Sequence, residues 1–329
     1  MRFYVSFIMI LFLCLGLGCN GGSSSGSNGI SSGGSNQNQT DNSVSTSSPT
    51  ISGCQIFPSD NPWNTDISVY PLDLNSSHYI SYILNGQNEH IHPDFGGAGE
   101  YGIPYMTVNS SQARYKIIPQ YADESDQDGA YGFYYPIPPD APVENGSDAH
   151  VIVLDTDHCK LYELYAASFS NNAWNCGSAA IFDLTSNNLR PDYWTSADAA
   201  GLPILPGLVR YDEVAAGEVN HAIRVTFSRT QKGFIHPATH YASNITDANA
   251  PPMGLRLRLK ADYDLSSITG EALIIARALK KYGFLVADNG SDFYFQGSQD
   301  VRWNDNDLNQ LKTIPGSAFE VVYTGEIHH

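Results

Sequence analysis

The chain has 329 residues, and its 34 acidic side chains outnumber 17 basic ones to give a formal net charge of −17 at pH 7. Binding to nucleic-acid phosphates needs a basic surface, so we expect no nucleic-acid partner. Tyr (20), Phe (14), Gly (29) and Pro (18) are abundant and only 16% of the residues are charged, which is typical of a loop-rich β-protein and not of a helical bundle.

The N-terminal residues predict export. Arg2 precedes an apolar run, residues 3–15, that is too short for a comfortable membrane span, so we expect residues 1–18 to be a removable signal peptide. Cys19 directly follows a small residue, as in the bacterial lipobox, where this Cys is diacylated. We therefore expect an extracytoplasmic protein, at the cell surface or in the periplasm, that contacts a bacterial membrane only through a lipid on Cys19. An ordinary secretory signal with an incidental Cys19 is the alternative.

A spacer and a folded region follow the signal. Apart from the lipidated Cys19, residues 19–53 are nearly all Gly, Ser, Asn, Gln and Thr. Such a segment cannot bury enough apolar surface to offset its conformational entropy, so it is expected to be a disordered tether. Residues 54–329 contain no second low-complexity break and no internal repeat, and we expect them to form a single globular β-rich domain.

Strand signals cluster in the middle of the folded region. Short apolar or alternating runs predict strands at 150–155, 159–165, 179–184, 219–227 and 255–260. Apolar residues at helical spacing over 271–282, with Gly283 as the stop, predict a helix, and shorter ones are expected at 305–313 and 196–200. The expected fold is mostly β: an antiparallel, jelly-roll-like β-sandwich with two or three peripheral helices.

The two-residue period of a strand sorts the polar side chains by face. Glu163 shares a face with Leu161 and Tyr165, and a face that mixes acids with aromatic rings suits a sugar cleft. Rings stack on sugars, and carboxylates carry out acid–base chemistry. A partly buried Glu163 that is satisfied by a neighbour is the alternative. His221 lies on the apolar face of its predicted strand, where a hydrogen-bonded core histidine is the alternative to a catalyst.

Cysteine and histidine spacing gives little sign of a metal centre. After signal cleavage the chain keeps Cys19, Cys54, Cys159 and Cys176. If Cys19 carries lipid, one disulfide and one free thiol is the simplest arrangement, and Cys159 could pair with either Cys54 or Cys176. No Cys-x-x-Cys pair exists, and the histidine groups at 90–94 and 236–240 lack a known zinc spacing, so we expect no metal site and no cofactor.

Specific blocks of sequence include FPSDNPWN at 57–64, WTSADAAGLPI at 194–204, GLVRYDEV at 207–214, and shorter motifs at 221–224, 287–291 and 302–305. These blocks resemble a family of secreted bacterial proteins known only as hypothetical or uncharacterised, and the similarity covers nearly all of residues 54–322. The family has no established activity, so the resemblance implies no functional residues. It implies a disulfide between Cys54 and Cys159, because these positions tend to be Cys in the family, whereas that of Cys176 varies.

Two classes of function fit these observations. The first is an extracellular carbohydrate-active enzyme, with a glycoside hydrolase that uses paired carboxylates on a polysaccharide or cell-envelope glycan as the preferred form. The pair to test first is Glu163 and Glu213. The wider set comprises the acids Asp183 and Asp198, His221 as the partner that tunes one acid, Tyr165 and Trp194 as sugar platforms, and Arg210 and Arg224 for substrate binding.

Two alternatives stay open. A polysaccharide lyase would use His221 or a tyrosine as base, and Arg210 or Arg224 would neutralise the uronate of its substrate. A non-catalytic glycan-binding or envelope scaffold lipoprotein would use the same aromatic side chains without chemistry. The sequence has no Gly-x-Ser-x-Gly motif, no Walker loop and no dinucleotide fingerprint, which disfavours esterases, NTPases and dehydrogenases.

Overall fold

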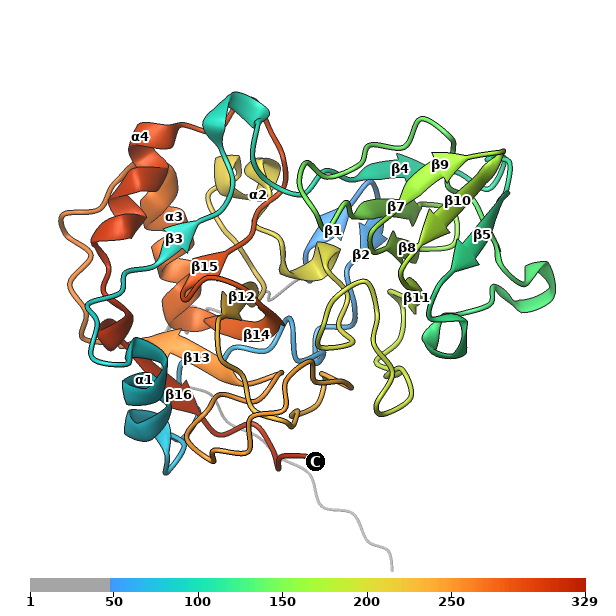
Figure 1. Cartoon of the computed structure of the whole chain (residues 1–329). Helices are drawn as coiled ribbons and strands as arrows, with labels where there is room; N and C mark the ends of the chain where they lie inside the picture. The colour runs from blue at the N-terminus through green and yellow to red at the C-terminus, as the bar shows by residue number, and fades with distance from the viewer. Residues whose placement is uncertain (1–47) are drawn as a thin grey trace, which may run out of the picture. The chain divides into compact units, whose positions relative to one another are not determined.

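The computed structural model describes residues 48–329 (Figure 1). The predicted signal peptide, Cys19 and most of the predicted tether lie outside this range. Within it the protein is mostly β, as the sequence predicts, and it has no helix long and apolar enough to cross a membrane. The last residues of the predicted tether are structured: β1 (Thr50–Ile51) pairs with β2 (Cys54–Gln55), and Ile51 is buried.

A four-stranded sheet at the middle of the chain has both faces covered. Its strands, in spatial order, are β11 (Ala179–Asp183), β8 (Lys160–Leu164), β7 (Val151–Asp155) and β4 (Met106–Val108). Ile152 and Leu154 point into the larger hydrophobic core, whereas Val151 and Val153 belong to a second, smaller core. Double coverage explains why residues 151–155 form an apolar run and not an alternating pattern.

The second four-stranded sheet closes the smaller core. Its spatial order is β6 (Tyr134–Tyr135), β5 (Tyr115–Pro119), β10 (Ala173–Cys176) and β9 (Ser168–Ser170). Ile117 and Trp174 from this sheet share the smaller core with Val153 and Leu164. These two sheets therefore pack face to face, with apolar side chains between them.

The third large sheet contains six strands and carries the longer helices (Figure 1). Its spatial order is β16 (Phe319–Val322), β13 (Arg256–Leu259), β14 (Phe284–Asn289), β12 (Ile223–Phe227), β15 (Tyr294–Phe295) and β3 (His92–Pro93). Helix α1 (Ser76–Leu84) lies against β16, and α3 (Gly270–Lys281) lies against β13. Side chains of the six-stranded sheet and of β7, β8 and β11 share the larger core, so one apolar interior connects both halves of the domain.

The remaining helices are short. They are α2 (Tyr211–Ala215), α4 (Asp305–Leu308) and the 3₁₀ segments η1 (Gly97–Gly99), η2 (Ala122–Glu124), η3 (Gly129–Tyr131), η4 (Leu205–Gly207), η5 (Asn309–Thr313) and η6 (Gly316–Ala318). The helices predicted at 271–282 and 305–313 correspond to α3 and to α4 with η5. Gly283 follows α3 with φ +65°, as the predicted helix stop requires.

Three predictions about the fold need correction. All three large sheets are mixed, because β4 pairs parallel with β7, β5 with β10, β12 with β14 and β3 with β15, so they do not form the purely antiparallel sheets of a jelly roll. Such parallel pairs need crossover connections: β13 and α3 lie between β12 and β14 in the chain. Residues 196–200 are not helical, and the predicted strand at 219–227 begins only at Ile223.

The disulfide joins Cys54 to Cys159, with the Cα atoms 5.4 Å apart, as the resemblance to the uncharacterised family implies. It links β2 to the residue before β8 across a sequence separation of 105 residues. Cys176 is a free, buried thiol, and burial raises its pKa to about 12, so it is an inert core residue.

Candidate functional site

A cleft of about 560 Å³ lies where the ends of β8 and β14 meet the 195–199 segment. Tyr165 directly follows β8, Ser178 lies between β10 and β11, and the end of β14 contributes Asp288 and Asn289. The other lining residues are Tyr121, Glu124, Asp148, Thr195, Ser196, Ala197, Asp198, Ala199, His240 and Ala242. The cleft thus lies between the two halves that share the larger core.

The lining of this cleft is acidic. Its charged side chains are Glu124, Asp148, Asp198 and Asp288, and within the described part of the chain no Lys or Arg lines it. Tyr121, 48% exposed, and the half-buried Tyr165 add aromatic surface. The cleft therefore combines several carboxylates with rings that can stack on a sugar.

Arg224 connects two of the acids from behind the cleft. This side chain lies on the central strand β12 and is 3% exposed. Its Nη2 atom hydrogen-bonds Oδ1 of Asp198 and lies 3.7 Å from Oδ2 of Asp288. The two carboxylates thus approach a single nitrogen, which keeps them within about 6.5 Å of one another for ordinary hydrogen-bond lengths.

The two acids differ in burial. Burial raises the pKa of Asp198 to about 8, although Arg224 opposes the shift. Asp198 has a side chain that is 0% exposed, and its Oδ2 atom accepts no hydrogen bond within the described part of the chain. Burial also raises the pKa of Asp288, which is 23% exposed and accepts a 2.7 Å hydrogen bond from the backbone N–H of Asn289. One guanidinium thus faces two carboxyl groups whose pKa values are both raised by burial, which favours a proton held by the pair.

Hydrogen bonds hold the 195–199 segment in place. The backbone N–H of Thr195 donates to Oε2 of Glu124 at 3.0 Å, and the backbone N–H of Asp198 donates to Oγ of Ser196 at 2.9 Å. Arg190 donates to the backbone carbonyls of Glu124 and Thr195 at 2.7 and 2.8 Å. Asp198 is therefore presented by a loop that is fixed from both sides, as a functional side chain must be.

A buried His–Glu pair adjoins the same segment, and the sequence analysis did not find it. Nδ1 of His150 contacts Oε2 of Glu144, and its Nε2 lies 3.0 Å from the backbone carbonyl of Ala197. Burial lowers and Glu144 raises the pKa of His150, with a net upward shift. The pair comes from the chain just before β7, so no local spacing relates it to Asp198.

Glu163 is buried and does not lie on an open face that could form a sugar cleft. It shares the Leu161 face of β8, but that face is covered by the larger core, and Glu163 is 0% exposed. Its carboxylate accepts hydrogen bonds of 2.9 and 3.0 Å from the backbone N–H of Ile204 and one of 2.9 Å from that of Leu205, at the start of η4. Burial raises the pKa of Glu163 to about 7, against the effect of these bonds. Glu163 does not line the Asp198 cleft. It anchors residues 204–205, which follow the 195–199 segment of the cleft wall.

Glu213 lies in a different cleft, of about 430 Å³, with Arg210. Its Oε1 accepts a 2.8 Å hydrogen bond from the backbone N–H of Arg210 and lies 3.0 Å from Nε2 of His221, and its Oε2 pairs with the Arg210 guanidinium. Burial raises the pKa of Glu213, but Arg210 and His221 outweigh it and the net shift is downward. His221 therefore contacts an acid, as expected, from a position before β12. The predicted pair Glu163 and Glu213 does not share a cleft.

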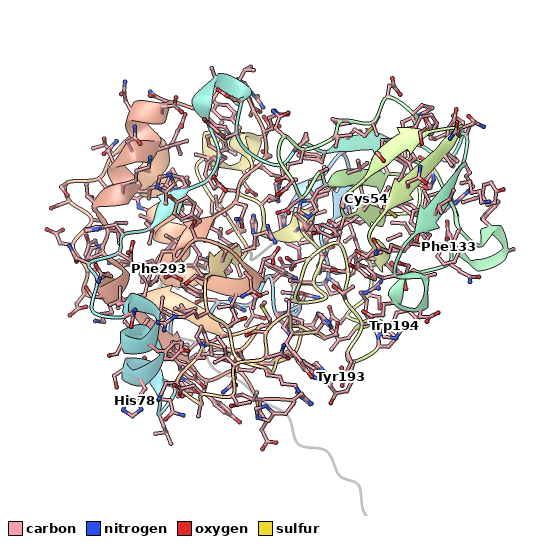
Figure 2. All side chains as sticks on the ribbon, viewed as in Figure 1. Cys54, His78, Phe133, Tyr193, Trp194 and Phe293 are labelled. Carbon is pink, nitrogen blue, oxygen red and sulfur yellow. A yellow bond between two sulfur atoms is a disulfide. The ribbon has the colours of Figure 1, made fainter. Side chains whose placement is uncertain are left out.

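The other expected site residues fall in several places. Tyr165 lines the Asp198 cleft, and Arg224 supports it from behind. Asp183 is exposed at the end of β11, where it accepts hydrogen bonds from the backbone N–H and hydroxyl of Thr185. Trp194 lies on the loop between β11 and η4 beside Tyr193 (Figure 2), with its ring 5.8 Å from the Arg190 guanidinium, and does not line the cleft.

Glu124, Asp148 and Asp288 are cleft acids that the sequence patterns do not single out. Asp288 lies on β14, a strand that those patterns do not predict, although residue 288 belongs to the 287–291 block that contributes to the resemblance. The WTSADAAGLPI block supplies the other side of the cleft through residues 195–199. Two of the specific blocks thus meet at one site.

No family model matches the chain, and no curated protein or solved structure matches it significantly. The function is therefore argued from the site alone.

Proposed function

We propose that this protein is a glycoside hydrolase whose active site is the Asp198–Asp288 cleft. The observation that carries the proposal is a pair of carboxyl groups, one fully buried and one open to the cleft, that share the buried guanidinium of Arg224. Hydrolysis of a glycosidic bond needs a protonated acid and an ionised carboxylate, roughly 5–10 Å apart across both stereochemical types. Because Nη2 of Arg224 lies near both acids, Oδ1 of Asp198 and Oδ2 of Asp288 are at most about 6.5 Å apart, an upper bound that admits the roughly 5–5.5 Å spacing of retaining enzymes.

The two acids take different roles in this mechanism. Oδ2 of Asp198, which is free of hydrogen bonds to the described residues, carries the proton; because this side chain is 0% exposed, transfer to the leaving sugar oxygen requires the 195–199 segment to move when substrate binds. Asp288, which is open to the cleft, attacks the anomeric carbon or activates a water molecule. Arg224 touches no substrate and is a positioning residue: it keeps the two carboxyl groups together and lets one of them remain ionised.

The charge of the lining favours a neutral or amino-sugar glycan. Four carboxyl groups line the cleft, no Lys or Arg among the described residues does, and Arg224 behind it is already shared by two of the acids. A uronate would meet like charges without a free cation to neutralise it, which disfavours the lyase alternative. We further propose that the exposed glycan of a cell envelope or matrix is the natural partner, reached by a domain tethered through Cys19.

A polysaccharide panel with point variants tests the proposal. Asp198→Asn and Asp288→Asn keep size and remove ionisation, and each should lower the release of reducing ends by a factor of about 100 or more. Asp264→Asn is the matched control, because this exposed aspartate only accepts hydrogen bonds from Ser266. Thermal melting of all variants checks that they fold.

The outcomes separate the competing functions. Hydrolysis of a neutral or amino-sugar polymer that is lost in both cleft variants supports the proposal. Unsaturated uronate products, read by their absorbance, would assign a lyase instead. Binding of a glycan with no turnover of any polymer would assign the scaffold class, and equal activity of Asp198→Asn, Asp288→Asn and the control would remove this cleft from the mechanism.

A further inference from the structure

We propose that Asp192, His236 and His328 form a binding site for one divalent transition-metal ion of the Zn²⁺ type. One ligand atom of each residue lies within 4.8 Å of the others. Oδ1 of Asp192 is 2.8 Å from Nε2 of His236, and the His236 and His328 ring centroids are 4.4 Å apart. This cluster lies outside the Asp198 cleft lining and plays no part in the proposed hydrolysis.

The donor set fits the metal. Two imidazole nitrogens and one carboxylate oxygen are common protein ligands of Zn²⁺, and three such ligands leave a fourth position for water. The Asp192 and His236 side chains are 41% and 39% exposed, so an ion in solution can reach them. Binding needs the 2.8 Å Asp192–His236 contact to widen and the ligand atoms that lie up to 4.8 Å apart to move closer, since ligand atoms around a tetrahedral Zn²⁺ lie about 3.3 Å apart.

Backbone contacts hold two of the ligands before any ion binds. The backbone N–H of Phe234 donates to the carbonyl of His328 at 3.0 Å, and the reverse bond is 2.8 Å. The Phe234 ring stacks on the His328 imidazole, with centroids 5.2 Å apart, and lies 5.8 Å from that of His236. One aromatic side chain therefore supports both histidine ligands.

The third ligand is held by its neighbour. The backbone N–H of Tyr193 donates to the carbonyl of Thr239 at 2.6 Å, and the Tyr193 hydroxyl donates to the carbonyl of His329 at 3.1 Å. Tyr193 thus connects the Asp192 turn to both other segments. A site that is built before the ion arrives loses less entropy on binding.

An ordinary His–Asp contact accounts for only part of this cluster. It leaves the His328 ring nitrogens without a partner: Phe234 stacks on the face of this imidazole, but its nitrogens hydrogen-bond no group among residues 48–329 although they lie beside a second imidazole and a carboxylate. A shared cation uses all three side chains. His240, the other histidine of the 236–240 group, is not part of the cluster, and its Nδ1 contacts the carbonyl of Ala199 at 2.7 Å.

The ion would join three separate segments of the chain. The 191–194 turn continues into residues 195–199 of the cleft wall, and the segment after His236 reaches the cleft at His240. A metal bound at Asp192, His236 and His328 therefore stabilises the outer side of that wall.

Titration of the chelator-treated full chain with Zn²⁺, and with Co²⁺ as a spectroscopic probe, tests the site. We expect one ion per chain at this site, visible-range Co²⁺ absorption that Zn²⁺ abolishes, and a higher melting temperature with Zn²⁺. Asp192→Asn, His236→Gln and His328→Gln should each weaken Zn²⁺ binding by at least about tenfold. His329→Gln is the matched control, because its Nδ1 only donates to the carbonyl of Lys232.

Each result decides the matter. Equal melting temperatures of all variants in chelator show that a loss of affinity comes from lost ligands and not from misfolding. Absence of Zn²⁺ binding to the full chain overturns the proposal. So does unchanged affinity in the three ligand variants, or a loss in His329→Gln as large as theirs, since either would place the ion elsewhere.

Discussion

Asp198, on a loop, and Asp288, on a strand, approach the same nitrogen atom, Nη2 of Arg224. Asp198 comes from the segment before η4, whereas Asp288 lies on β14 and Arg224 on the adjacent strand β12. Because one cation faces two acids, the protonation of each acid depends on the charge of the other.

Arg224→Gln should destabilise the protein most strongly at alkaline pH. The change leaves Asp198 and Asp288 buried without their cation, and removing one partner of a buried ion pair costs about 3–5 kcal/mol. The pKa of both acids should rise further, so protonation relieves most of this cost at low pH and the cost returns as pH rises. Urea unfolding at pH 5 and pH 8 measures the difference.

Arg277→Gln on α3 is the control for that experiment, because this arginine is exposed. It should change the free energy of unfolding by less than about 0.5 kcal/mol at either pH. A pH-independent loss in Arg224→Gln would contradict the argument, since it would show that packing and not charge balance is the role of Arg224.

Glu163→Gln should remove a loss of stability that the native protein suffers between about pH 4.5 and pH 7. Burial raises the folded-state pKa of Glu163 from 4.5 to about 7, so as pH rises the unfolded chain ionises first and folding becomes less favourable. The stability contribution is complete below the unfolded pKa and is lost by the folded pKa. Relative to the native protein, the variant should gain about 3 kcal/mol between pH 4 and pH 8.

Gln can still accept the backbone hydrogen bonds of Ile204 and Leu205, so any cost of the substitution itself should not vary with pH. Glu326→Gln, at an exposed position, should give parallel curves. A difference between Glu163→Gln and the native protein that stays constant from pH 4 to pH 8 would show that Glu163 does not carry a raised pKa.

Gly283→Ala should cost several times more than the same change at Gly86. Both glycines have a left-handed backbone, with φ of +65° and +77°. A Cβ at Gly283 would lie 2.0 Å from the carbonyl oxygen of Leu257, whereas a Cβ at Gly86 would meet nothing within 4 Å. Gly86→Ala therefore measures the conformational cost alone, about 1–2 kcal/mol, and the excess at Gly283 measures the clash. If urea unfolding gave equal losses of unfolding free energy for the two variants, β13 would have to shift away from the new Cβ without cost.

Local patterns predicted several elements well. The apolar run at 151–155, the 271–282 helical spacing and the Gly283 stop each depend on neighbours in sequence, and each is observed. Helix α2 escaped detection because it has only five residues, too few for a periodic pattern, although the Glu213 side chain accepts a hydrogen bond from the backbone N–H of the N-cap residue Arg210. The strand pairing could not be predicted, because the parallel partners β12 and β14 are separated by a strand and a helix.

The candidate site could be predicted only in part, because its residues come together from segments that are distant in the sequence. Period-2 spacing placed Glu163 on the Leu161 face, but only the tertiary structure shows that this face is covered. Asp198, Tyr165 and Arg224 were among the expected residues and lie at or behind one cleft. Asp288 lines the cleft from β14, whereas the Glu144–His150 pair contacts the backbone of Ala197 in its wall, and no spacing rule connects these distant parts of the chain.

We propose that Cys19 attaches the protein to a membrane, and Cys19→Ala should then release it. A diacylated cysteine would be the hydrophobic attachment left after signal cleavage, so its loss removes the membrane affinity. Fractionation of cells that express the native protein and the variant measures the effect. Cys176→Ala is the control, because this thiol is buried in the smaller core and should not alter partitioning. Retention of Cys19→Ala in the membrane fraction would contradict the anchor.

The double variant Cys54→Ser, Cys159→Ser should lose about 4–5 kcal/mol of stability, because the disulfide closes a loop of about 100 residues and restricts the unfolded chain. The bond also fixes the β1–β2 hairpin, which would otherwise be a short two-stranded element with little independent stability. Urea unfolding of the native protein with and without reductant should reproduce the same difference. Cys176→Ser leaves the Cys54–Cys159 disulfide intact, so reductant should destabilise this variant by the full amount. Peptide mapping that finds Cys159 bonded to Cys176 would contradict this pairing and place the disulfide at the end of β10.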